Sequence, residues 1–154
     1  MRRIVFIFIT VVLFVACSDK GNEPKEEMYA GITTTDDTGL VLSIVDDDWC
    51  YDKDSITTGS KISAKLIPTE FSFYPAYPNP CSTEVRMQFG VPAQTYIEFY
   101  LKSNDRKTVF SLLKTFEAGY YELLIDVEPA PAGIYRCYMN AGDFSCYGDI
   151  QIVK

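Results

Sequence analysis

The sequence predicts an all-β fold, an antiparallel β-sandwich of about seven strands that follows a short N-terminal β-hairpin. The first observation is the stretch 84–89, which alternates between polar and apolar side chains and so places Val85, Met87 and Phe89 on one face. The second is a series of further β-prone runs, separated by turn residues at intervals typical of sandwiches. The third is an aromatic content of 14%, because aromatic side chains suit a pleated surface.

Residues 77–81, Tyr-Pro-Asn-Pro-Cys, determine where the first long strand begins. Each proline fixes its own φ and biases the residue before it away from helix. We therefore expect the strand to start after these prolines, at Glu84, and to end at Val91-Pro92.

Five more strands are expected along the chain, over residues 96–101, 108–113, 121–127, 134–139 and 144–153. The alternation in the first of these predicts that Ile97, Phe99 and Leu101 face the core. Tyr96 and Tyr100 then face the solvent.

A hairpin is expected upstream of the sandwich. Residues 32–35 and 40–45 are β-prone and flank a turn rich in Asp and Gly at residues 36–39. Alone such a hairpin would be only marginally stable, so we expect it to pack on the sandwich.

The acidic stretch 46–48 is interpreted as a solvated loop. Clustered carboxylates could bind Ca²⁺, but their spacing here does not match a calcium-binding loop. A polar connector, 55–65, follows.

The N-terminus has the pattern of an export signal. Arg2 and Arg3 precede an apolar run, 4–16, that is too short to span a bilayer stably. Cys17 directly follows this run, in a sequence that resembles the lipobox of bacterial lipoproteins, and we expect it to carry a lipid anchor. The alternative is a plain secretory signal with an incidental cysteine. The chain thus divides into a signal peptide (1–16), a flexible tether (17–29), a hairpin and acidic segment (30–65) and the sandwich domain (66–154).

The composition excludes several functions. Without histidine, Ser-His-Asp, Cys-His and His-metal chemistries are absent. The formal charge is −7, and it becomes −9 once a leader with two arginines is removed, so nucleic acid and anionic membrane surfaces are disfavoured partners. No spacing of carboxylates assembles a reaction centre. We expect a protein that is not an enzyme and that binds no cofactor and no metal.

Three features together resemble a known family. They are Tyr-Pro-Asn-Pro at 77–80, the alternating strand that ends in Val91-Pro92, and Pro-Ala-Gly-Ile-Tyr at 131–135 before a hairpin. They resemble the Ig-like domain of the flagellar hook-cap protein FlgD and, equally, the C-terminal sorting domains of type IX secretion. The resemblance covers residues 71–154 and implies an Ig-like sandwich. The sequence departs from the family at two places. The family usually has Phe at the position of Cys81, and FlgD-like domains have a Trp-Asp-Gly turn where this chain has Ile-Asp-Val at 125–127. The second departure favours the sorting domains.

Four cysteines follow the leader, in a compartment where thiols oxidise. If residues 141–142 form the loop of the last hairpin, Cys137 lies directly opposite Cys146. This register predicts a disulfide between them.

The remaining pair would join Cys50 to Cys81 and clamp the loop around Trp49 onto the sandwich. Unpaired core thiols are the alternative at both places. A structural zinc ion would need closer ligand spacing.

The outside of the predicted sandwich carries a candidate interaction surface. Tyr96 and Tyr100 share the outer face of one predicted strand, and the alternation along another strand places Arg136 and Tyr138 on its outer face. Aromatic residues and arginine are enriched at binding surfaces, although sandwich exteriors also carry tyrosines without partners. The sequence therefore predicts a non-enzymatic, lipid-anchored protein of the cell envelope, at the outer membrane or cell surface, whose sandwich is a structural or protein-interaction module. The alternative is a type IX secretion substrate whose C-terminal domain is a sorting signal.

Overall fold

The computed structural model describes residues 31–45, 48–53 and 67–154. The predictions for the leader, the tether, Cys17, Asp46, Asp47 and the connector 55–65 concern residues outside these ranges. All nine elements in the described part are strands, which confirms the predicted all-β sandwich. In this part of the chain, no helix is long and apolar enough to cross a membrane.

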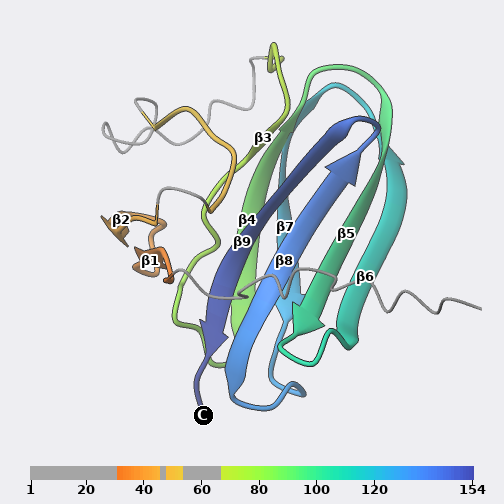
Figure 1. The fold of residues 1–154 in the computed structure, drawn as a ribbon. Coiled ribbons are helices and arrows are strands. Elements are labelled where there is room, and N and C mark those ends of the chain that lie inside the picture. Colours follow the sequence, from red (N-terminus) through yellow and green to blue (C-terminus); the bar gives the residue numbers. More distant parts are fainter. Residues whose placement is uncertain (1–30, 46–47, 54–66) are drawn as a thin grey trace, which may run out of the picture.

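The strands form three antiparallel sheets (Figure 1). The N-terminal hairpin pairs β1 (Thr34–Thr35) with β2 (Val41–Ser43). One layer of the sandwich has three strands, in the order β3 (Ser72–Phe73), β4 (Glu84–Val91) and β7 (Gly119–Asp126). The other has four, in the order β6 (Thr108–Phe116), β5 (Thr95–Ser103), β8 (Gly133–Ala141) and β9 (Phe144–Ile152).

The core lies between the two layers and follows the alternation of the sequence. Val85, Met87 and Phe89 of β4 are buried, as predicted. The Phe89 ring contacts the Phe99 ring of β5 across the layers, with 4.7 Å between ring centroids. Tyr96 is 51% exposed on the other face of β5, so the predicted parity of this strand is confirmed.

Asn79, between the two prolines of the motif, covers the outer edge of β9. Its buried side chain donates from Nδ2 to the carbonyl oxygens of Thr33 (2.7 Å) and Asp149 (3.0 Å). Its Oδ1 accepts a hydrogen bond from the N–H of Gln151 at 2.9 Å. Its backbone exchanges two hydrogen bonds with Thr35 of β1. A single asparagine therefore satisfies the peptide groups of a strand edge and fixes the N-terminal hairpin to that edge.

The motif tyrosine is held by the three-stranded layer. Tyr77 Oη donates to the Glu122 carboxylate at 2.6 Å, and Gln88 Nε2 donates to both groups at 3.1 Å. Burial raises the pKa of Tyr77 to about 12, and the hydrogen bond from Tyr77 lowers the pKa of Glu122. Gly39 of the hairpin turn lies against the Tyr77 ring. Both peptide bonds that precede the motif prolines are cis.

The loop around Trp49 packs on the inner side of the β9 edge. The backbone N–H of Trp49 donates to the carbonyl of Tyr147 at 2.7 Å. Its ring lies 5.0 Å from the Phe73 ring, and a Cβ on Gly148 would overlap the indole. The indole therefore occupies a place that any side chain at position 148 would fill.

Both predicted disulfides, Cys137–Cys146 and Cys50–Cys81, are wrong. The structure instead joins Cys50 to Cys146. Cys50 thus holds the Trp49 loop on the sandwich, with Cys146 in place of Cys81. Cys81 and Cys137 are free and buried, and burial raises the pKa of Cys81 to about 11 and that of Cys137 well above its ordinary value.

The register of the last hairpin explains the wrong pairing. Gly142 has a φ of 60°, as the first central residue of a type II′ turn requires, and Ala141 pairs with Phe144. The loop therefore lies one residue later than predicted, and every cross-strand partner is displaced by two residues. Because a displacement by two keeps each side chain on its own face, Cys137 remains inward, but its partner is Gly148.

Candidate interaction surface

The outer face of the four-stranded layer carries rows of side chains that run across the strands. The central row consists, in the order β6, β5, β8, β9, of Ser111, Tyr100, Tyr138 and Tyr147. The row on one side consists of Leu113, Glu98, Asn140 and Ser145. The row on the other side consists of Thr108, Lys102, Arg136 and Asp149. Since neighbouring strands lie about 4.8 Å apart, Tyr100, Tyr138 and Tyr147 form a continuous strip, which we call the tyrosine row.

Lys102 lies over the tyrosine row. Its Nζ is 5.3 Å from the centroid of the Tyr100 ring and 5.2 Å from that of Tyr138, within the range of cation–π attraction. The Tyr138 and Tyr147 ring centroids are 6.3 Å apart. Tyr100 Oη donates to the Glu98 carboxylate at 3.1 Å, which raises the pKa of Tyr100 and keeps it neutral. The rings are therefore held in place while all three tyrosines stay partly exposed.

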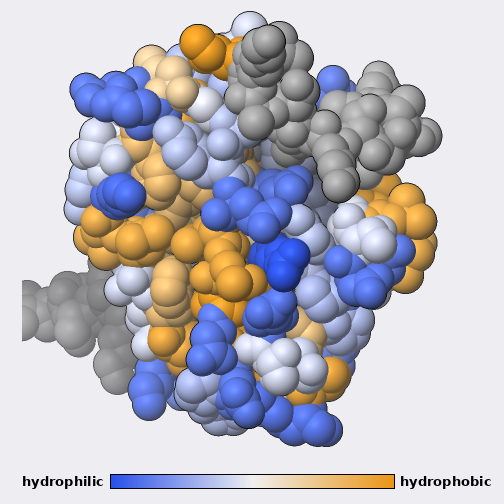
Figure 2. Space-filling model, turned by 180° about the vertical axis from the view of Figure 1, so that it is seen from behind, coloured by the Kyte–Doolittle hydropathy of each residue, from blue (hydrophilic) through white to orange (hydrophobic). Residues whose placement is uncertain are grey.

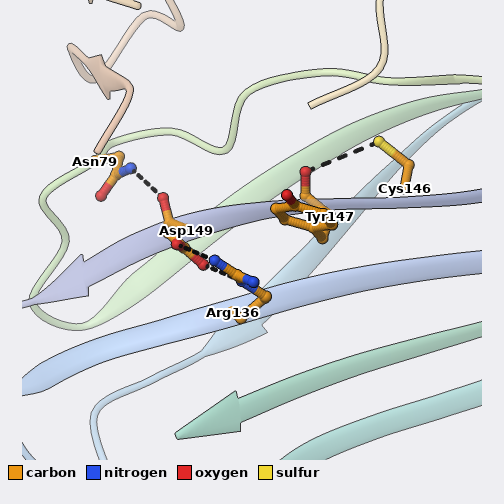
Figure 3. A network of polar contacts seen from close by, with 5 residues as sticks. All are labelled: Asn79, Arg136, Cys146, Tyr147 and Asp149. Carbon is orange, nitrogen blue, oxygen red and sulfur yellow. Dashed lines mark hydrogen bonds and ion pairs between the residues drawn. The ribbon is translucent and has the colours of Figure 1, made fainter. Parts of the chain in front are cut away.

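Arg136, predicted as an exposed member of this surface, is buried. Its guanidinium donates from Nε and Nη2 to the two carboxylate oxygens of Asp149, each at 2.8 Å (Figure 3). The carboxylate raises the pKa of the guanidinium, and the Tyr147 ring lies 4.3 Å from its central carbon. The register of the hairpin places Asp149 directly opposite, so the two charges neutralise each other. Arg136 therefore packs against the Tyr147 ring, and its side chain is not exposed to a partner.

The structure brings together two of the three predicted tyrosines. Tyr100 and Tyr138 are direct cross-strand neighbours, whereas Tyr96 lies four residues away from Tyr100 on the same face of β5. Tyr147, 37% exposed, was not predicted. Its signal in the sequence is the alternation of β9, because an inward Cys146 requires an outward Tyr147.

No group of three or more Cys, Asp or Glu side chains in the described ranges is placed to hold a metal ion. Comparison of the chain with protein-family models and with curated proteins gave no match.

Proposed function

We propose that the protein is a non-enzymatic, lipid-anchored protein of the cell envelope, at the outer membrane or cell surface, and that its Ig-like sandwich is a protein-interaction module. The tyrosine row is the observation that carries the proposal. Tyrosine supplies a large and rigid contact area with a polar tip, and few rotamers are lost when it binds. The anchor is assigned to Cys17 because this cysteine directly follows the apolar run of the leader.

The neighbours of the tyrosine row support binding to a protein. Ser111, Asn140 and Ser145 flank it with hydrogen-bonding groups, and Lys102 and Glu98 add one charge of each sign. Tyrosine, serine and asparagine are the residues that dominate antibody paratopes. Because Lys102 and the buried ion pair already fix the rings, a partner would pay little ordering entropy on binding.

The sorting-signal alternative requires a cargo that is separable from its address. In the structure the N-terminal hairpin pairs with Asn79, and the segment 48–53 is joined to β9 by the disulfide Cys50–Cys146. These segments cover a strand edge of the sandwich and belong to the same folding unit. Their integration favours the interaction module over the address.

Site-specific photo-crosslinking in intact cells tests the interaction surface. A benzophenone amino acid at Tyr138 should give a discrete adduct, and one at Leu124, which is 53% exposed on the three-stranded layer, should not. Replacing Tyr100 and Tyr147 by Ser should weaken the adduct while the melting temperature stays within a few degrees. Equal adducts at both positions, or none, would contradict the proposal, and a large loss of stability would show that the row belongs to the core.

Metabolic labelling with a fatty-acid analogue tests the anchor. The wild-type protein should be labelled and the Cys17→Ser variant should not. Equal labelling of the two would remove the anchor from the proposal.

A further inference from the structure

The N-terminal hairpin exposes a stripe of aliphatic side chains. Leu40, Leu42 and Ile44 occur within five residues of β2 (Val41–Ser43) and its flanks, and they are 53%, 65% and 50% exposed. We call these three residues the β2 stripe. Figure 2 shows apolar surface at the side of the molecule where the hairpin lies. Three exposed large aliphatic side chains so close together on a hairpin form more apolar surface than hydrophobic residues that occur singly.

The β2 stripe is held rigidly relative to the sandwich. Thr35 Oγ1 donates to the carbonyl of Ala76 at 2.7 Å, and the backbones of Thr35 and Asn79 exchange two hydrogen bonds. Thr33 Oγ1 accepts from the N–H of Val45 at 3.0 Å, which closes the hairpin. Whatever binds the β2 stripe therefore also fixes the orientation of the sandwich.

We infer that the β2 stripe rests on the lipid surface into which the anchor at Cys17 inserts, an inference that depends on the proposed function. The hairpin is the first described element after the anchor. Fourteen residue steps separate Cys17 from Gly31, and a chain of that length spans at most about 50 Å. A contact within this reach is intramolecular, so the effective concentration is high and even weak insertion is sufficient.

The chemistry of the β2 stripe fits lipid better than a protein partner or a second copy of this chain. Protein interfaces enrich aromatic residues and arginine and use about 20–30 residues on each side, whereas the β2 stripe consists of three aliphatic side chains. Half-buried Asp36 and exposed Asp37 lie at the turn beside it, and hydrogen bonds from Thr38 and Leu40 lower the pKa of Asp36. Two negative charges at its end favour a zwitterionic over an anionic surface.

If the β2 stripe contacts the lipid surface, the tyrosine row remains accessible to a partner. The hairpin lies beside the β9 end of the four-stranded layer, and β6 lies at the far end (Figure 1). The tyrosine row runs from β9 across β8 to β5, towards the β6 edge of this layer. A membrane contact at the hairpin thus orients the row along a line that leads away from the lipid.

The test is quenching of tryptophan emission by lipids with brominated acyl chains, with the lipidated full-length protein in phosphatidylcholine vesicles. Leu42→Trp places the reporter in the β2 stripe, and Leu124→Trp, at a position 53% exposed on β7, is the matched control. The wild-type protein, whose Trp49 is buried, gives the baseline. We expect the brominated lipids to quench most of the emission that the new tryptophan of Leu42→Trp adds to the wild-type baseline. They should quench none of the emission added by Leu124→Trp. Adding Leu40→Ser and Ile44→Ser to Leu42→Trp should reduce the loss.

The experiment gives a different result for each way in which the two proposals can fail. If the protein floats with the vesicles and Leu42→Trp is quenched no more than Leu124→Trp, the contact with lipid is overturned and the anchor stands. If the wild-type protein neither floats with the vesicles nor carries acyl mass on Cys17, both proposals are overturned. If unlipidated Cys17→Ser protein that carries Leu42→Trp shows a blue shift that grows with protein concentration, a second copy is the occupant.

Discussion

Replacing Asn79 by Ala should lower the free energy of unfolding by about 3 kcal/mol, because its side chain makes three hydrogen bonds to peptide groups, each contributing about 1 kcal/mol. The side chain is fully buried, so the carbonyls of Thr33 and Asp149 and the N–H of Gln151 would lose their partner in a desolvated place. Asn79→Asp should be worse than Asn79→Ala. It would place a carboxylate oxygen where the amide now donates to two carbonyl oxygens.

Chemical unfolding followed by the fluorescence of Trp49, the only tryptophan in the chain, measures these losses. Asn104→Ala, in an exposed turn, is the control and should stay within about 0.5 kcal/mol of the wild type. The amide of Gln151 should also exchange its hydrogen faster in Asn79→Ala. A loss below about 1 kcal/mol, or equal losses for the Ala and Asp variants, would refute the argument that this asparagine stabilises the fold by covering β9.

Three further predictions concern the neighbouring contacts. Gly148→Ala should cost about 2 kcal/mol or more and shift the emission of Trp49 to longer wavelength, because the new Cβ occupies the place of the indole; unchanged emission would contradict this packing. In the native protein at neutral pH neither Cys81 nor Cys137 should react with a thiol reagent, since burial raises the pKa of both, and denaturant without reductant should expose both; prompt reaction of either thiol in the native protein would count against their burial. Arg136→Gln should cost about 3–5 kcal/mol in thermal or chemical unfolding by leaving the charge of Asp149 buried, and adding Asp149→Asn should recover part of this loss; full stability of the single variant would show that the pair is dispensable.

The layers and the faces of the strands could be predicted from the sequence, because a period of two in hydrophobicity directly sets which side chains turn inward. The inward assignment of Ile97, Phe99 and Leu101 is confirmed by their burial. The hairpin upstream of the sandwich is likewise confirmed, with Thr35 paired to Val41. These features depend on the local sequence pattern alone, so a single sequence is sufficient to predict them.

The partners across the last hairpin could not be predicted, since its turn sequence permits two loop positions that differ by one residue. The predicted register places Arg136 opposite Tyr147, and the observed one places it opposite Asp149. One displacement thus accounts both for the wrong partner of Cys137 and for the burial of Arg136. The role of Asn79 was also beyond local reasoning, because the hydrogen-bond partners of its side chain lie 46 to 72 residues away along the chain.

The two edge strands of the four-stranded layer, β9 and β6, are protected against strand addition in different ways. This difference bears on how the proposed partner could bind. At the β9 edge, Asn79 and the peptide groups of Cys81 bind backbone groups of Asp149, Gln151 and Val153, so these groups are not available to a further strand. At the β6 end no strand is paired on the outer side within the described residues, but Lys114 lies opposite the inward Ile97, with its Nζ 5.4 Å from the centroid of the Phe116 ring. An inward-pointing charge on an edge strand opposes strand addition, because pairing would bury it. Since one edge is covered and the other is charged, binding through added strands is disfavoured at both edges, so the proposed interaction would have to use side chains of the sheet face.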